Sequence, residues 1–231
     1  MRSGATVKTM LASSSVRAMI VFVVVMVALI YALWPRDGAA DTAGGGPPSS
    51  TRGVTDEAVP ASMLAQARTE AALPPCPRST APVPGGAALK NVSALCLADG
   101  ERVDLGAATA GRPTVINLWA VWCLPCRREL PLFAELSERA GDRLDVLAVH
   151  ARDGGAKPYA ILKFLTEVGV RLPTVTDVDG SVAAALAAPR VFPSTLLLRA
   201  DGTVAATLPR VFDSYDDLAS VVEKELGVDV S

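Results

Sequence analysis

The architecture of this chain is clearest at residues 118–130, which read L-W-A-V-W-C-L-P-C-R-R-E-L. An apolar run ends there at Trp119, and a mixture of Arg, Glu and Leu follows Cys123 and Cys126. A short continuous apolar run is typical of a strand that is buried on both faces. The stretch therefore predicts a strand that leads into a helix, with both cysteines where that helix begins.

The position of the two cysteines favours redox chemistry. Free N–H groups and the macrodipole at a helix N-terminus stabilise an anion, which lowers the pKa of the Cys123 thiol and raises its thiolate fraction. Pro125 fits the first turn, where its missing N–H costs nothing. One turn later, Cys126 can attack a mixed disulfide formed by Cys123. The spacing predicts an exposed nucleophile, Cys123, and a buried resolving thiol, Cys126.

Two other uses of the cysteine pair are weaker. A zinc site with four cysteine ligands needs a second closely spaced pair, but Cys76 and Cys96 are far apart in the sequence and His150 is the only histidine. A purely structural bridge between Cys123 and Cys126 closes too small a loop to restrain the unfolded chain. Thiol–disulfide exchange is therefore favoured, with no metal and no organic cofactor.

The N-terminal part of the chain predicts export of the rest across a membrane. Residues 18–34 read AMIVFVVVMVALIYALW and carry no charge. As a helix they would span roughly 26 Å, close to the hydrocarbon thickness of about 30 Å. Residues 1–17 hold three basic residues and no acidic one, which places them in the cytoplasm. A signal peptide cleaved near residues 38–40 is the alternative, but the long run favours a retained single-pass anchor.

The composition after the anchor separates a tether from a folded domain. Residues 35–74 are rich in Gly, Pro, Ser, Thr and Ala and are expected to form a flexible linker, although residues 61–73 can form a short helix. Residues 75–231 alternate strands with helices and predict an α/β sandwich. Strands are expected at 92–97, 102–105, 114–119, 144–149, 174–176, 195–198 and 204–208, and helices at 123–140, 159–168, 181–188 and 215–226.

The charge of the chain gives no indication of a nucleic-acid partner. The formal net charge is −2, and the sequence has no basic cluster. Proteins that bind nucleic acid usually carry a basic patch or stripe, so this class is not expected.

Residues 117–131 resemble the active-site segment of the thioredoxin superfamily, most closely its membrane-tethered TlpA/ResA branch, which includes the thiol reductases of cytochrome c maturation. The resemblance covers residues 89–228 and implies a thioredoxin-like three-layer sandwich with an extra N-terminal β-hairpin. Asn117 stands where cytoplasmic thioredoxins have a buried Asp. The resemblance also implies that Glu129, with a pKa raised by burial, exchanges protons with the thiols. A solvated helix carboxylate is the alternative for Glu129.

The same resemblance implies a cis-proline that faces the cysteine pair. Phe192-Pro193 comes directly before a predicted strand and matches this landmark. A cis bond would turn the backbone of Phe192 toward the substrate, ready for strand-like hydrogen bonds. Val191 and Ser194 depart from the usual Gly and Thr of the family. Trp122, next to the nucleophile, is expected to shield the disulfide or to contact a partner.

The remaining cysteines, Cys76 and Cys96, most simply form a structural disulfide outside the cytoplasm. On the chain-entropy model this bridge contributes about 3 kcal/mol to stability and holds the proline-rich lead-in onto the domain. A second redox pair that relays electrons to Cys123 is the alternative. Neither cysteine has the helix-start setting that activates a thiolate, which favours the structural disulfide.

The expected function is that of an extracytoplasmic disulfide reductase attached to the cytoplasmic membrane. Its substrates would be protein disulfides, with apocytochrome c implied by the resemblance, and a thiol-carrying membrane protein would supply electrons. The uncharged Leu124-Pro125 dipeptide favours a reductant over a strong oxidant. Three alternatives stay open: a disulfide oxidase or isomerase for secreted proteins, a non-catalytic adaptor that holds clients near Pro193, and a peroxidase.

Overall fold

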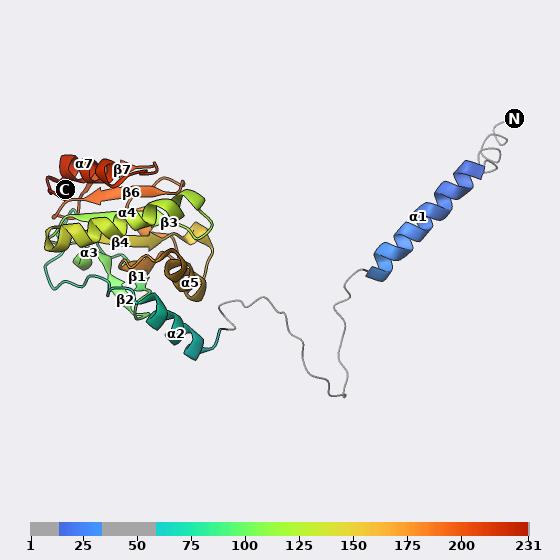
Figure 1. Ribbon diagram of the computed structural model, residues 1–231, viewed down its shortest axis with the longest axis horizontal. Coiled ribbons are helices and arrows are strands. Elements are labelled where there is room, and N and C mark those ends of the chain that lie inside the picture. The colour runs from blue at the N-terminus through green and yellow to red at the C-terminus, as the bar shows by residue number, and fades with distance from the viewer. Residues whose placement is uncertain (1–13, 34–58, 231) are drawn as a thin grey trace. The chain divides into compact units, whose positions relative to one another are not determined.

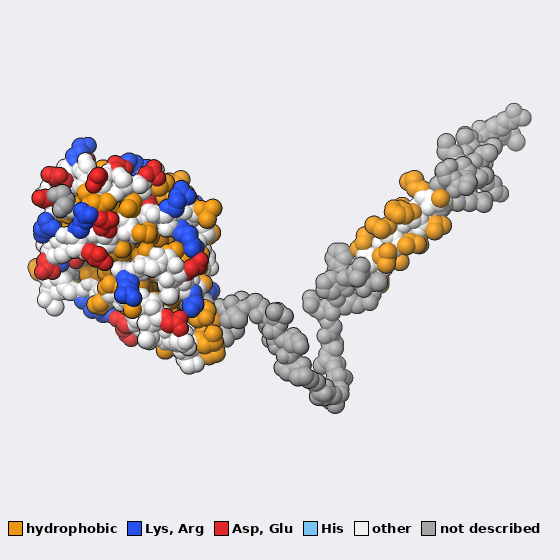
Figure 2. Space-filling view, viewed as in Figure 1, with side chains coloured by type: hydrophobic (Ala, Val, Ile, Leu, Met, Phe, Trp, Pro, Cys, Tyr) orange, Lys and Arg blue, Asp and Glu red, His pale blue; other side chains and the backbone are white. Residues whose placement is uncertain are grey.

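The computed structural model of the protein describes residues 14–33 and 59–230 (Figure 1). Helix α1 (Ser14–Leu33) belongs to one unit, and all other elements belong to a second unit that begins at residue 52. The side chains described in α1 are exposed and mostly hydrophobic, as Figure 2 shows. Among the described residues, none of the helices combines the length and hydropathy that a membrane crossing requires.

The anchor predicted at residues 18–34 therefore stays a prediction. Most of the predicted cytoplasmic segment, 1–17, lies outside the described residues, as do residues 35–58 of the predicted linker.

A seven-stranded mixed sheet lies at the centre of the second unit, in the order β2-β1-β5-β4-β3-β6-β7. The strands are β1 (Ser93–Cys96), β2 (Arg102–Asp104), β3 (Thr114–Trp119), β4 (Asp145–His150), β5 (Thr174–Thr176), β6 (Ser194–Leu198) and β7 (Val204–Leu208). The central strands β3, β4 and β5 are parallel, whereas β6 and β7 are antiparallel additions on one side and the β1–β2 hairpin is an antiparallel addition on the other. Every residue of β3 is buried, because this strand is covered on both faces.

Helices cover both faces of the sheet and complete three layers. They are α2 (Ala61–Ala71), α3 (Leu105–Ala108), α4 (Leu124–Ala140), α5 (Pro158–Val168), α6 (Ser181–Ala185) and α7 (Tyr215–Leu226), with the 3₁₀ turns η3 (Gly141–Arg143) and η4 (Arg152–Gly154). One core cluster contains residues of α2, α4, α5 and α7, and a second contains residues of α3 and α6. The α/β sandwich and its additional N-terminal hairpin agree with the sequence-based prediction.

The short helix expected at residues 61–73 is present as α2, but it packs against the domain although the range 35–74 was assigned to a flexible linker. Its Ala67 and Ala71 are buried in the same core cluster as α4. The carboxylate of Glu70 pairs with the ammonium group of Lys163 in α5, at 2.9 Å. The folded unit therefore includes α2 and begins earlier than predicted. Alanines form no clear apolar stripe in the sequence, so the sequence did not predict that α2 packs against the core.

A disulfide joins Cys76 to Cys96, whose Cα atoms are 6.0 Å apart. Both cysteines are buried, Cys96 ends β1, and the Sγ atom of Cys76 lies 3.5 Å from the carbonyl oxygen of Thr174 in β5. The bridge thus holds the proline-rich lead-in against two strands. It belongs to the core cluster of α3 and α6, whereas Cys123 and Cys126 belong to the other cluster. This separation favours a structural role over an electron relay.

Candidate active site

The junction of β3 and α4 positions the redox pair. Strand β3 ends at Trp119, and Cys123 is the N-cap residue of α4, so Leu124 is the first helical residue. The backbone N–H of Cys126 donates a hydrogen bond to the Sγ atom of Cys123 at 3.2 Å. A donor in this position stabilises a negative charge on the sulfur. The two sulfurs form a disulfide, with Cα atoms 5.3 Å apart.

The two cysteines differ in exposure less than the sequence predicts. Cys126 is fully buried, as a resolving thiol should be, but Cys123 is only 3% exposed. The sulfur of Cys123 is bonded to Cys126 and accepts a backbone hydrogen bond, so the side chain turns into the core. Its neighbours Trp122 and Leu124 are 59% and 71% exposed. The surface beside the disulfide is therefore apolar.

Glu129 lies one helical turn beyond Cys126, on the same side of α4, and is fully buried. The side-chain amide of Asn117 donates to its Oε1 at 2.7 Å, and the backbone N–H of Phe212 donates to its Oε2 at 3.1 Å. Burial raises the pKa of Glu129 to about 7, the two hydrogen bonds oppose this rise, and the charge of Asp213 adds to it. A carboxyl group that titrates near neutral pH can both give and accept a proton.

Asn117 suits both protonation states of that carboxyl group. Its Nδ2 donates to Glu129, while its Oδ1 has no hydrogen-bond partner within the described part of the chain. Rotating the amide by half a turn would present Oδ1 to the protonated form of Glu129 as an acceptor. An Asp at this position would place a second carboxylate beside the first, so Asn fits a site with one proton-exchanging acid.

The segment before β6 brings a second residue, Phe192, against Trp122, the neighbour of Cys123. The Phe192–Pro193 peptide bond is cis, as the resemblance implies. The ring of Phe192 packs edge-on against the ring of Trp122, with centroids 5.8 Å apart. The indole N–H of Trp122 donates to the carbonyl oxygen of Asp153 in η4 at 3.3 Å. Trp122 and Phe192 therefore lie together, as expected for residues that share one substrate surface.

Turn η4 supports Trp122, and the sequence alone did not reveal this. Gly154 packs so tightly against His150 that a Cβ atom on the glycine would lie 2.4 Å from the Cε1 atom of the imidazole. His150 ends β4, is buried, and packs edge-on against Trp119. Burial lowers the pKa of His150 to about 4, so the ring is neutral at physiological pH. In the sequence, Asp153-Gly154 reads only as a loop.

Known proteins with similar sequences are named for thiol–disulfide chemistry. The thiol:disulfide interchange protein CycY of Rhizobium leguminosarum bv. viciae is 34% identical over 131 residues, which are 54% of this chain and 66% of that protein. The thiol-disulfide oxidoreductase ResA of Bacillus subtilis is 29% identical over 107 residues, which are 46% of this chain and 57% of that protein. The matches thus span between about half and two thirds of the length of these relatives.

Solved structures and a family model agree with the fold described above. The structure of a secreted disulfide oxidoreductase of Mycobacterium tuberculosis, homologous to E. coli DsbE, aligns with a TM-score of 0.51 and 26% identity. It covers 59% of this chain and 97% of the other. The model of the Redoxin family matches residues 83–221, which include Cys123, Cys126, Glu129 and Pro193. With more than half of its length matched, the chain belongs to the Redoxin family, within the TlpA/ResA-like part of the thioredoxin superfamily.

Proposed function

We propose that this chain is an extracytoplasmic thiol–disulfide oxidoreductase that reduces disulfides in proteins. The observation that carries the proposal is the Cys123–Cys126 pair at the N-terminus of α4, with the buried carboxyl group of Glu129 one turn away. The names of the similar proteins support the same class of reaction. The proposed roles are nucleophile for Cys123, resolving thiol for Cys126 and proton acceptor for Glu129.

In the first step, the thiolate of Cys123 attacks one sulfur of a substrate disulfide. A new bond forms between this sulfur and the Sγ atom of Cys123, and the substrate disulfide breaks. The departing substrate sulfur leaves as a thiolate and takes a proton from solvent. The hydrogen bond from the N–H of Cys126 stabilises the attacking anion before this step.

In the second step, Cys126 resolves the mixed disulfide. Its thiol gives a proton to the carboxylate of Glu129 and then attacks the Sγ atom of Cys123. The second substrate sulfur leaves as a thiolate and is protonated. Two electrons have then passed from the dithiol to the substrate, the two substrate thiols have taken their protons from solvent, and Glu129 returns the proton of Cys126 to solvent. The protein is left with the Cys123–Cys126 disulfide seen in the structure. A membrane protein that carries a dithiol would return the electrons.

The reduction potential of the pair tests the direction of electron flow. The dipeptide Leu124-Pro125 places no charge between the cysteines, which supports a reductant. We expect equilibration with glutathione to give a potential near about −270 mV, as in reducing thioredoxins, and not near about −120 mV, as in strong oxidants. The second value would instead support an oxidase of secreted proteins.

Turnover separates an enzyme from a client-binding adaptor. With the full-length protein, a dithiol donor and a protein disulfide substrate, Cys123→Ser is expected to abolish reduction. Substitution of the half-buried Ser137, in the same helix, by Ala is the matched control and should leave the rate unchanged. Equal rates for wild type and Cys123→Ser would contradict the enzymatic function. Apocytochrome c is the proposed physiological client, and its purified form is the substrate to compare with other disulfide proteins.

A single-pass anchor at residues 18–34 completes the proposal and places the catalytic domain outside the cytoplasm. The uncharged run, its basic N-terminal flank and the Cys76–Cys96 disulfide support this topology. We expect the full-length protein to stay in the membrane fraction after extraction with alkaline carbonate, whereas a chain starting at residue 52 should be released. Release of both proteins would contradict a retained anchor.

A further inference from the structure

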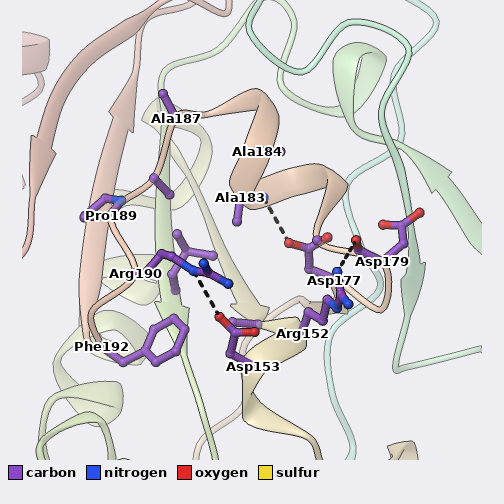
Figure 3. Close-up of a pocket in the computed structure, with 14 residues that line it drawn as sticks. Arg152, Asp153, Asp177, Asp179, Ala183, Ala184, Ala187, Pro189, Arg190 and Phe192 are labelled. Atoms are coloured by element: carbon purple, nitrogen blue, oxygen red, sulfur yellow. Dashed lines mark hydrogen bonds and ion pairs between the residues drawn. The ribbon is translucent and has the colours of Figure 1, made fainter.

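The buried acid in the cavity beside Phe192 is fully hydrogen-bonded (Figure 3). The side chain of Asp177 is almost completely buried, and its two oxygens accept from the N–H groups of Val182 and Ala183, at 3.0 and 2.9 Å. These bonds satisfy two of the N–H groups that a helix leaves free at its start. Most buried polar groups in proteins are paired in this way, so buried groups that lack a partner call for an explanation.

Two buried side-chain atoms on β3 and β6 have no hydrogen-bond partner in the part of the chain that the structure describes. They are the Oδ1 atom of Asn117 and the Oγ1 atom of Thr195, and both residues are completely buried. Asn117 and Thr195 are direct partners in the antiparallel register of the two strands. Their side chains therefore leave the same face of the sheet, with Cβ atoms about 4.5–5.5 Å apart.

Neither residue has another polar side chain directly opposite it across the sheet. On its other side Asn117 is in register with Ala148 of β4, and Thr195 is in register with Leu208 of β7. Rotation of Thr195 about χ1 can bring its hydroxyl to the amide of Asn117, since the two Cβ atoms are close. Each of the two groups is thus the natural partner of the other.

The amide of Asn117 has to serve Glu129 in two protonation states. Opposite the carboxylate, its Nδ2 atom donates to Oε1 at 2.7 Å, and its Oδ1 atom then needs a donor. Opposite the protonated acid, Oδ1 turns to accept the proton, and Nδ2 then needs an acceptor. A hydroxyl group both donates and accepts, so Thr195 can pair with whichever end of the amide faces it.

We propose that Thr195 is a positioning residue whose hydroxyl completes the hydrogen bonding of the Asn117 amide in both orientations, so that the amide follows the protonation of Glu129. The inference rests on the proposed function, in which Glu129 accepts the proton of Cys126. Thr195 acts through Asn117 and not on the sulfur atoms. Strand β6 then takes part in proton transfer in addition to carrying the segment that holds the cis-proline.

The charged and titratable groups around Glu129 are not altered by a substitution in β6. The charge of Asp213 raises the pKa of Glu129, and Arg210 of the same segment pairs with a carboxylate of α7 at 2.8 Å. His150 of β4 has a pKa lowered to about 4 by burial and is neutral above that pH. Cys126 has no proton to lose while the disulfide is intact, so the oxidised protein isolates the titration of Glu129.

Infrared spectra of the oxidised full-length protein measure this titration. The carbonyl band of protonated Glu129 is identified by its absence in Glu129→Gln, and the wild type should lose it near about pH 7. Thr195→Val removes the hydroxyl and keeps the shape. Proteins tolerate a buried carbonyl without a donor better than a buried N–H without an acceptor, so the variant disfavours the amide orientation that serves protonated Glu129. The pKa of Glu129 should fall by about 1.

Two variants test whether the hydroxyl is the cause. Thr195→Ser keeps a hydroxyl and should keep the wild-type pKa of Glu129. Thr176→Val removes another buried hydroxyl that has no partner within the described residues, on β5, and should also keep the wild-type pKa. Circular dichroism checks folding, and Thr195→Ala replaces the Val variant if that variant does not fold.

A double substitution tests the route through Asn117. In a protein that already carries Asn117→Ala, Thr195→Val should not change the pKa of Glu129 further, because the amide that the hydroxyl serves is absent. A second fall of the same size would show that the two residues act independently, and it would overturn the inference.

Single-turnover reduction separates the inference from the proposed function. The reduced protein is mixed with an aromatic disulfide whose thiols absorb light, so that one thiol is released when Cys123 attacks and a second when Cys126 resolves. At about pH 8, Thr195→Val should slow the second release and leave the first unchanged, because a weaker base takes the proton of Cys126 less readily.

The outcomes of the two measurements are distinct. An unchanged pKa of Glu129 in Thr195→Val, or an equal fall in Thr195→Ser or Thr176→Val, would overturn the role of Thr195 alone. A wild-type protein that releases neither thiol would contradict the proposed function, whereas the infrared titration of the oxidised protein would still decide whether Thr195 positions the amide.

Discussion

Replacement of Glu129 by Gln should make the protein more stable at alkaline pH. Glu129 is buried, and this burial raises its pKa from the ordinary value of 4.5 to about 7. Gln has nearly the same shape and no charge. Its carbonyl oxygen can accept from the N–H of Phe212, and its amide can donate to the Oδ1 atom of Asn117, which has no partner in the described residues. The substitution therefore removes the titration and keeps two hydrogen bonds.

The size of the effect follows from the shift in pKa. Between about pH 4.5 and 7 the unfolded chain loses the proton of Glu129 while the folded protein keeps it. Stability therefore falls as pH rises through this window, and the full contribution is present only below it. The shift corresponds to about 3 kcal/mol in the free energy of unfolding. As pH rises through this window, the free energy of unfolding of the wild type should fall by roughly this amount relative to that of Glu129→Gln, because the variant has no carboxyl group at this position.

Urea denaturation of the oxidised proteins across this pH range measures the difference directly. The free energy of unfolding of Glu129→Gln minus that of wild type should increase with pH and level off above about pH 7. Glu138→Gln, at an exposed position of the same helix, is the control and should follow the wild type. A difference between Glu129→Gln and wild type that does not change with pH would refute the reasoning that burial raises the pKa of Glu129.

Three further predictions concern the supporting structure. Gly154→Ala should lower the free energy of unfolding by about 1–3 kcal/mol in thermal denaturation, because its Cβ would lie 2.4 Å from His150. Gly85→Ala, in open space, should stay within about 0.5 kcal/mol, and equal losses would contradict tight packing at Gly154. Replacing Cys76 and Cys96 together by Ala should cost about 3 kcal/mol in urea denaturation, whereas an unchanged midpoint would argue against a structural bridge. The imidazole signals of His150 in NMR spectra should report a neutral ring down to about pH 4, and titration near 6.5 would show that the ring is solvated.

Local patterns in the sequence were sufficient to predict most of the elements. Strands β3, β5 and β7 and helix α7 have the predicted bounds, because apolar runs and a cap mark their limits. The hydroxyl of Ser214 accepts from the N–H of Asp217 and begins α7. Helix α6 is shorter than predicted, since Ala187 adopts a left-handed conformation with φ of 47°. Gly or Asn usually marks such an end, and neither is present here.

Contacts between distant segments could not be read from the sequence. The packing of α2 brings Glu70 to Lys163 of α5, and the buried carboxylate of Glu129 accepts a hydrogen bond from the backbone of Phe212. Each of these pairs is far apart in the chain, so no local period reveals it. The cavity beside Phe192 likewise forms only when three separate segments meet. The redox pair was recognised because its chemistry lies within four consecutive residues.

Capture of a mixed disulfide tests the central claim most directly. The Cys126→Ser variant, reduced and then exposed to a client disulfide, lacks the resolving thiol and should retain the client. Mass spectrometry of non-reduced peptides should locate the new bond at Cys123, with no adduct in the variant that also carries Cys123→Ser. An adduct at Cys76 or Cys96, or equal capture by the two variants, would contradict exchange through Cys123.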